Sequence, residues 1–359
     1  MCSFQLCGRR WEARLIATMR PGGRLRAYFL FVAALLYFFV ARSLARRAAL
    51  GFAGDAFFPL VEQIMLAFLL LVGYGAMGFW IDRQLDPIAE QGLPRRNGWS
   101  RETGLGLAAG WAVAIVCVLP MTIIGSIVIF FSGQRSNWGW MLADAAFFAC
   151  FALSEEIAFR GYAFQCFARA VGPLGASLGF AAIYPIVQQL VPGSSHASFA
   201  VAAAFTLLLS AAYWRTRALW VSWGLNFGWR ASRALLFGLP VNGVSTHSHL
   251  VQGDPTGPFW LTGGAFGLEG SWFAFVVMLA ALPFVFRLTR DLNYRYNAPV
   301  LVPRGIPVDI ESAARAQHEA AMGAAVPSEP ALVQIGPAAT APADPSEASS
   351  PAGSGHAET

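Results

Sequence analysis

Long runs of apolar residues, each about as long as a bilayer crossing, constrain this chain more than any other feature. Eight runs are present, at roughly 28–46, 57–81, 104–132, 138–168, 173–191, 197–214, 218–238 and 271–289. A transmembrane helix needs about 20 mostly apolar residues, so each run is a candidate span. Only 13% of the residues are charged, about half the share found in soluble domains. The sequence therefore predicts an all-α fold, a polytopic transmembrane helical bundle of about eight spans.

The distribution of arginine orients this bundle, because all 25 basic residues are arginine. With the N-terminus inside, eighteen arginines fall on the inner side, three lie within apolar runs and four fall outside. The outer four are Arg42, Arg46, Arg47 and Arg135. Basic residues accumulate on the cytoplasmic side, so we expect a multi-pass protein of the cell (inner or plasma) membrane with both termini cytoplasmic. The same pattern accounts for the net charge of +5, and we expect no nucleic-acid partner.

Composition divides the chain into three parts. Residues 1–26 form a basic segment, expected in the cytoplasm, and residues 27–290 contain the apolar runs. Residues 291–359 are rich in Ala and Pro and poor in aromatic residues, so we expect a disordered cytoplasmic tail, with at most a short helix at 306–323. The segment 239–270 is rich in Gly, Pro and Ser and lacks arginine, which places it in an outer loop.

Two adjacent glutamates lie inside the fourth apolar run, where ionisable groups are costly and are functional candidates by default. Glu156 and Arg160 are four residues apart, so they share a helix face and can form an ion pair. Glu155 lies about 100° away around the helix and is not held by Arg160. A free carboxylate in an apolar site suits general acid or base chemistry. The alternative is that both glutamates only hold helices together.

Other ionisable residues in or near the apolar runs are weaker candidates. Glu62 and Asp144 lie in the second and fourth runs, where polar side chains most often join helices. Asp144 is about three turns before Glu155 and could line the same groove. The histidines lie in predicted outer loops, across the membrane from Glu155, or in the tail, and the loop histidines are expected to be solvated. They are His196, His247, His249, His318 and His356.

Motifs around and after the glutamate pair follow one another in an order that resembles a known family. They are Glu155-Glu156-x-x-x-Arg160-Gly161, Gly172-Pro173, Tyr184-Pro-Ile-Val-Gln188, Tyr213-Trp-Arg215-Thr-Arg217-Ala-Leu-Trp220, Gly224-Leu-Asn226-Phe-Gly-Trp-Arg230 and Gly263-Gly264-Ala-Phe266-Gly267-Leu-Glu269-Gly270. Together they resemble the CAAX-protease and bacteriocin-processing family of intramembrane metalloproteases. The resemblance covers roughly residues 90–290 and is strongest from 150 to 232.

This resemblance implies a core of four helices, spans four to seven at about 138–238, around a polar cavity that opens toward the cytoplasm. It also implies an endopeptidase of the type that cleaves prenylated CAAX proteins. In such a site the first glutamate, here Glu155, acts with histidines of two later helices to hold a metal ion and an activated water.

Three residues depart from the family pattern at the positions that matter for metal binding. Gln188 and Asn226 stand at the two histidines, and Arg230 stands at the asparagine that follows the second of them. Zinc takes Cys, His, Asp or Glu ligands, for which carboxamides are poor substitutes. Arg230 also brings a permanent positive charge to the same helix face as Asn226. We therefore expect no cofactor, although zinc would be required, with Glu155 as its remaining ligand, if the family activity persists.

Two functions remain open from the sequence. In the first, the chain is an endopeptidase in which Glu155 activates water and the Glu156–Arg160 pair holds the site together. In the second, it is an inactive relative that binds membrane peptides or partner proteins, with a Glu155–Arg230 ion pair in place of the metal. Expected partners are membrane lipid and membrane-associated or lipidated peptides or proteins. A small-solute transporter is less well supported, because the sequence has no inverted repeat.

Overall fold

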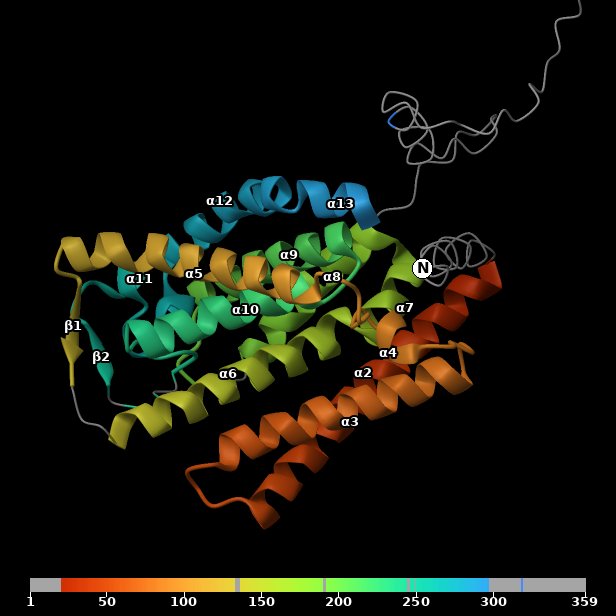
Figure 1. Ribbon diagram of the computed structural model, residues 1–359, viewed down its shortest axis with the longest axis horizontal. Helices are drawn as coiled ribbons and strands as arrows, with labels where there is room; N and C mark the ends of the chain where they lie inside the picture. The colour runs from red at the N-terminus through yellow and green to blue at the C-terminus, as the bar shows by residue number, and fades with distance from the viewer. Residues whose placement is uncertain are drawn as a thin grey trace, which may run out of the picture. The chain divides into compact units, whose positions relative to one another are not determined.

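The computed structural model of the protein describes residues 21–132, 136–189, 192–243, 246–248, 250–296 and 318. Its helices are α2 (Pro21–Phe52), α3 (Phe58–Trp80), α4 (Pro87–Glu90), α5 (Trp99–Ile123), α6 (Ser136–Arg160), α7 (Tyr162–Val171), α8 (Pro173–Gln188), α9 (His196–Thr216), α10 (Trp220–Ala231), α11 (Phe259–Thr262), α12 (Trp272–Leu288) and α13 (Arg290–Tyr296). A π-helical turn, η1 (Ser232–Leu236), continues α10, and two 3-10 turns, η2 (Gly264–Phe266) and η3 (Leu268–Gly270), precede α12. Two strands, β1 (Ile127–Phe131) and β2 (Val251–Pro255), form the sheet (Figure 1).

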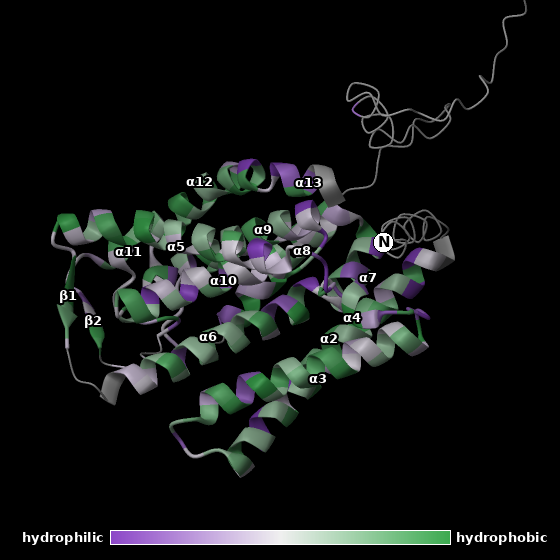
Figure 2. Cartoon of the chain, in the orientation of Figure 1, coloured by the Kyte–Doolittle hydropathy of each residue, from purple (hydrophilic) through white to green (hydrophobic). Residues whose placement is uncertain are grey.

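The prediction of an all-α helical bundle is confirmed, since each of the eight apolar runs is helical over most of its length. Among the described residues, four helices are long and apolar enough to cross a membrane: α2, α3, α5 and α9. The helices α8 and α12 are also apolar but shorter. Figure 2 shows hydrophobic residues along most of α3, α5 and α12, and hydrophilic positions on α6 and α10. The count of eight spans stays a prediction.

Glycines explain why two predicted spans have the wrong ends. The third run was expected to be helical to residue 132, but α5 ends at Ile123 and the chain turns at Gly125, which has a φ of 75°. The end of that run forms β1. The fourth run breaks at Gly161, where the backbone leaves the helical region with a ψ of −135°. A Cβ atom at Gly161 would collide with the carbonyl oxygen of Ile157, so glycine is required at this close approach.

The predicted outer loop at 239–270 is more ordered than expected. Its strand β2 pairs antiparallel with β1, with Ile129 opposite Gly253. The helix α12 begins after Ser271, whose hydroxyl accepts a hydrogen bond from the backbone N–H of Ala274 at 3.2 Å, as N-cap residues do. Helical structure continues in α13 past the predicted end of the bundle at residue 290. Apart from residue 318, the predicted helix at 306–323 and the rest of the tail lie outside the described residues.

Facing glycines bring α5 and α10 into backbone contact. Gly106 and Gly110 on α5 face the backbone of α10, while Gly224 and Gly228 on α10 face the backbone of α5. Each pair has the four-residue spacing of small residues at close helix crossings in membranes. A Cβ atom at Gly110 would collide with the carbonyl oxygen of Leu225. The crossing holds α10, and with it the polar residues on its opposite face, in a fixed position.

Two large apolar cores lie on either side of the fourth run. One joins α5, α9, α10 and α12 and includes Leu208 and Trp229. The other joins α2, α3, α7, α8 and the end of α6 and includes Tyr74 and Phe180. Figure 1 shows α6 running between α10 and the α2–α3 pair. The charged residues of α6 therefore lie at the junction of the two halves.

Candidate functional site

The two glutamates of α6 take different partners, as the helix geometry predicts. Glu156 is fully buried, and its Oε1 accepts a hydrogen bond from Nη1 of Arg160 at 3.0 Å. Arg160, itself 2% exposed, also reaches the carbonyl oxygen of Thr206 on α9. This ion pair joins consecutive turns of one helix and ties them to α9. The predicted Glu156–Arg160 contact is present.

Three donors from two other helices surround the carboxylate of Glu155. Oε2 accepts from Nη2 of Arg230 at 2.8 Å and from Nδ2 of Asn226 at 3.2 Å. Oε1 accepts from the hydroxyl of Tyr184 at 2.8 Å. Glu155 is 9% exposed and Arg230 is 3% exposed, so the pair is removed from solvent. The structure thus pairs Glu155 with Arg230, and neither residue forms an ion pair within its own helix.

Asn226 connects the two ion pairs. Its amide donates to Glu155 and, at 3.0 Å, to Oε1 of Glu156, while its own oxygen accepts from Nε of Arg230 at 2.8 Å. One carboxamide therefore contacts both carboxylates and the arginine. A histidine could not supply two N–H donors and an acceptor from one terminal group.

Gln188 contacts Glu155 only through an intervening residue. Its Nε2 donates to the hydroxyl of Tyr184 at 2.6 Å. Tyr184 is one helical turn before Gln188 and lies between it and Glu155. The same hydroxyl accepts from Arg230 at 2.9 Å. Tyr184 was not identified as a site residue, since its phenol is indistinguishable in the sequence from the many membrane aromatics.

Arg233, three residues after Arg230, belongs to a separate ion pair. The two terminal nitrogens of its guanidinium, Nη1 and Nη2, each lie 2.6 Å from a carboxylate oxygen of Glu269 in η3. It also stacks on the ring of Trp229 at 3.9 Å. Burial alone would raise the pKa of Glu269, but the adjacent Arg233 outweighs it and holds that pKa below its ordinary value. Across the junction of α10 and η1, Arg230 thus pairs with Glu155 of α6 and Arg233 pairs with Glu269 of η3.

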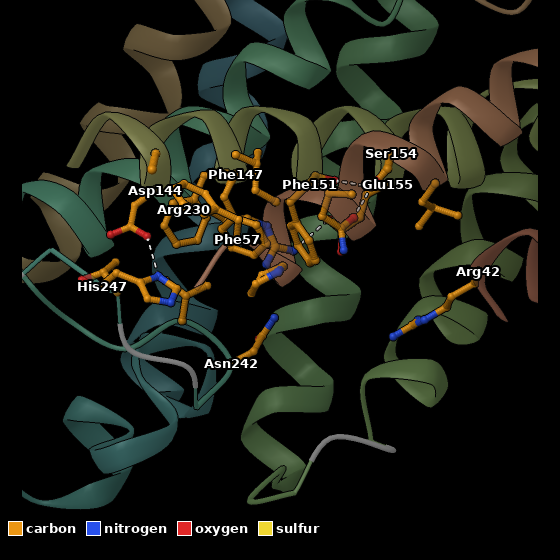
Figure 3. Close-up of a pocket in the computed structure, with 18 of the residues that line it drawn as sticks. Arg42, Phe57, Asp144, Phe147, Phe151, Ser154, Glu155, Arg230, Asn242 and His247 are labelled. Carbon is orange, nitrogen blue, oxygen red and sulfur yellow. Dashed lines mark hydrogen bonds and ion pairs between the residues drawn. The ribbon is translucent and has the colours of Figure 1, made fainter. Parts of the chain in front are cut away.

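A cavity of about 250 Å³ opens beside the Glu155–Arg230 pair. Its walls come from α2, α3, α6, α8 and α10 and from residues 241, 242, 246 and 247. Figure 3 shows Glu155 and Arg230 among the lining residues, with Asp144 and His247 beyond them. The lining includes the α2–α3 turn at Ala56 and Phe57, which the arginine distribution places outside. The predicted orientation therefore puts this end of the cavity on the outer side of the membrane. This is incompatible with the prediction that the cavity opens toward the cytoplasm.

His247 was expected to be a solvated loop residue, and its side chain is 42% exposed, but it also contacts α6. Its Nδ1 is 3.1 Å from Oδ1 of Asp144, and its ring stacks on Trp140 at 5.7 Å between centroids. The backbone N–H of Ser248 donates to the other oxygen of Asp144 at 2.9 Å. Asp144 lines the same cavity as Glu155, as its helical spacing suggested. The loop therefore covers one end of the cavity.

The candidate in α3, Glu62, does not contact the site, but its neighbour Gln63 does. Within the described residues, Glu62 makes no hydrogen bond or ion pair, whereas the oxygen of Gln63 accepts from the hydroxyl of Ser154 at 2.8 Å. This contact joins α3 to the turn of α6 that carries Glu155. Gln63 also lines the cavity.

The residues around Glu155 do not fit a zinc ion. In the described part of the chain, no three His, Cys, Asp or Glu side chains lie close enough together to hold a metal. The groups hydrogen-bonded to Glu155 are a guanidinium, a carboxamide and a phenol, and the carboxamide of Gln188 lies beyond the phenol. Zinc sites use carboxylate, imidazole or thiolate ligands. The permanent charge of Arg230 would repel a divalent cation from this position.

The fold and the buried polar site define the class: a helical membrane protein with a carboxylate–guanidinium pair at the junction of two helical halves. Residues 135–232 match the sequence model of a family described as type II CAAX prenyl endopeptidase Rce1-like. This segment is similar to the CAAX-protease family, and it contains every residue of the network around Glu155. No curated protein and no solved structure matches the chain.

Proposed function

We propose that this protein is a non-cleaving member of the CAAX-protease family that binds membrane-embedded ligands or partners in its cavity. The observation that supports the proposal is the ion pair between Arg230 and Glu155 at 2.8 Å. It stands where the family resemblance places a metal ion and its water. The family match supports a protease-like fold and cavity, while the side chains present favour binding over hydrolysis.

Hydrolysis requires Glu155 to contact water or metal, and its oxygens already accept three hydrogen bonds from Arg230, Asn226 and Tyr184. A buried arginine that loses its partner strongly destabilises the folded protein, so moving Arg230 away from Glu155 costs free energy. The network therefore keeps the carboxylate from acting as a base. The site therefore consists of a cavity beside the Glu155–Arg230 ion pair, whose two charges neutralise each other.

The test is the metal content of the purified full-length protein, compared with a Gln188→His, Asn226→His, Arg230→Asn triple variant. We expect the wild type to bind no stoichiometric zinc and to leave a prenylated CAAX peptide intact. The triple variant restores two imidazoles beside Glu155 and should bind zinc. Adding Glu155→Gln to it should weaken that binding, which separates a built site from adventitious zinc.

The alternative is the endopeptidase that the family resemblance implies. Stoichiometric zinc in the wild type, together with peptide cleavage that Glu155→Gln abolishes, would establish this function and refute the proposal. Cleavage that survives Glu155→Gln would point to a contaminating protease, so both measurements are made on the same preparation.

A further inference from the structure

The cavity beside the ion pair has walls suited to a hydrocarbon chain. Aromatic and aliphatic side chains line most of it, including Phe38, Phe57, Leu60, Phe147, Phe148 and Phe151. In Figure 3, Phe57, Phe147 and Phe151 lie between the two ends of the group. Such a surface binds apolar groups more favourably than it binds water.

Most polar groups deep in this cavity are hydrogen-bonded to one another, and Nη1 of Arg230 is an exception. Ser154 donates to Gln63, and Tyr184 joins Gln188, Glu155 and Arg230. A peptide entering this region would bring backbone N–H and C=O groups that need partners of their own. A hydrocarbon chain carries none, so the interior of the cavity favours a lipid tail over a polypeptide.

The charge at one end of the cavity is unmatched. Arg42 of α2 lines the cavity, yet it forms no ion pair with any acidic residue in the parts of the chain that the structure describes. Figure 3 shows its side chain directed toward the other lining residues, at the opposite end from Asp144 and His247. There Asp144 has His247 and Ser248 as partners. An anionic group is therefore complementary to the Arg42 end.

We propose that the cavity binds a single-chain anionic lipid, a free long-chain carboxylate, with its head on Arg42 and its tail among the phenylalanines. The inference rests on the proposed function, because a binding cavity and not a peptidase cleft is assumed. A guanidinium matches a carboxylate in a two-bond geometry, and each CH₂ group buried among apolar side chains adds favourable transfer free energy. Charge and apolar wall together select this ligand class.

The test is equilibrium binding of radiolabelled palmitate to the purified full-length protein. Arg42→Gln should weaken binding roughly tenfold, as expected for loss of a charge-assisted hydrogen bond, and Arg46→Gln on the same helix should not. Ala143→Trp should block the cavity, because Ala143 lines it. Leu36→Trp, at a side chain that is 62% exposed, is the matched control. Hexadecanol, with the same chain and no charge, should compete poorly.

Palmitate binding that is equal in the wild type, Arg42→Gln and Ala143→Trp would overturn the proposal, as would hexadecanol that competes equally well. Phosphatidylglycerol that binds in an Arg42-dependent manner while palmitate does not would place a phospholipid headgroup there instead. The assay detects no cleavage, so its failure leaves the metal and peptidase results unaffected. Conversely, a zinc-dependent cleavage activity would refute the non-cleaving function whatever the outcome with palmitate.

Discussion

Nη2 of Arg230 lies 2.8 Å from Oε2 of Glu155, although 75 residues separate them along the chain. The contact joins α10 to α6 at the junction of the two apolar cores. Asn226 extends it to Glu156 and so to Arg160. Two arginines and two glutamates therefore balance one another in a largely buried region beside the cavity.

Breaking this ion pair on one side should be costly. Arg230→Ala leaves Glu155 buried with its charge unmatched, and we expect a loss of about 3–5 kcal/mol in the free energy of unfolding. Adding Glu155→Gln removes the unmatched charge and should restore much of the loss. Chemical unfolding in detergent measures both effects. If the double variant is no more stable than Arg230→Ala, the pair does not contribute through its charge.

The glycine crossing of α5 and α10 provides a test that is independent of charge. Gly110→Ala places a Cβ atom against the carbonyl oxygen of Leu225, which forces backbone movement and should cost about 1–3 kcal/mol. Gly104→Ala on the same helix meets nothing within 4 Å and should be neutral or stabilising by about 0.4–1 kcal/mol. Thermal unfolding of the two variants compares them directly. Equal stabilities would show that the helices are not in backbone contact.

The Arg233–Glu269 pair should make stability depend on acid pH. The pKa of Glu269 is lowered in the folded protein, with Arg233 overcoming the opposing effect of burial. A lowered pKa contributes stability above the ordinary glutamate value of about 4.3, and this contribution is lost as the pH falls through the folded value. Glu269→Gln should therefore flatten the decline of stability below about pH 4.3. An unchanged acid limb would contradict the pairing.

Helix periodicity in the sequence was sufficient to predict which residues of one helix act together. The Glu156–Arg160 pair follows from a four-residue spacing, and the separate direction of Glu155 follows from the 100° turn per residue. Its partner Arg230 followed from the need to match a buried charge and from the family resemblance. The contact is present in the structure, while its role in function remains a proposal.

Contacts that depend on how distant segments meet were not predictable in the same way. Tyr184 was one of many aromatic residues, and only its position between Gln188 and Glu155 makes it part of the network. His247 was assigned to solvent because its segment is rich in turn-forming residues. Packing of that segment onto α6 brings it to Asp144, and composition contains no information about such packing.

The orientation of the bundle is the last prediction, and it decides which side the cavity faces. The excess of arginine on one side predicts that the C-terminus lies in the cytoplasm. A phosphatase that is active only outside the cytoplasm, fused after Arg295, should therefore give no signal. The cavity end should face outward, so a cysteine at Asn242, in a cysteine-free background, should react with an impermeant thiol reagent in intact cells. A cysteine at Leu85, 77% exposed on the opposite side, should react only after lysis. The reverse labelling pattern with a bright fusion would invert the bundle and turn the cavity toward the cytoplasm.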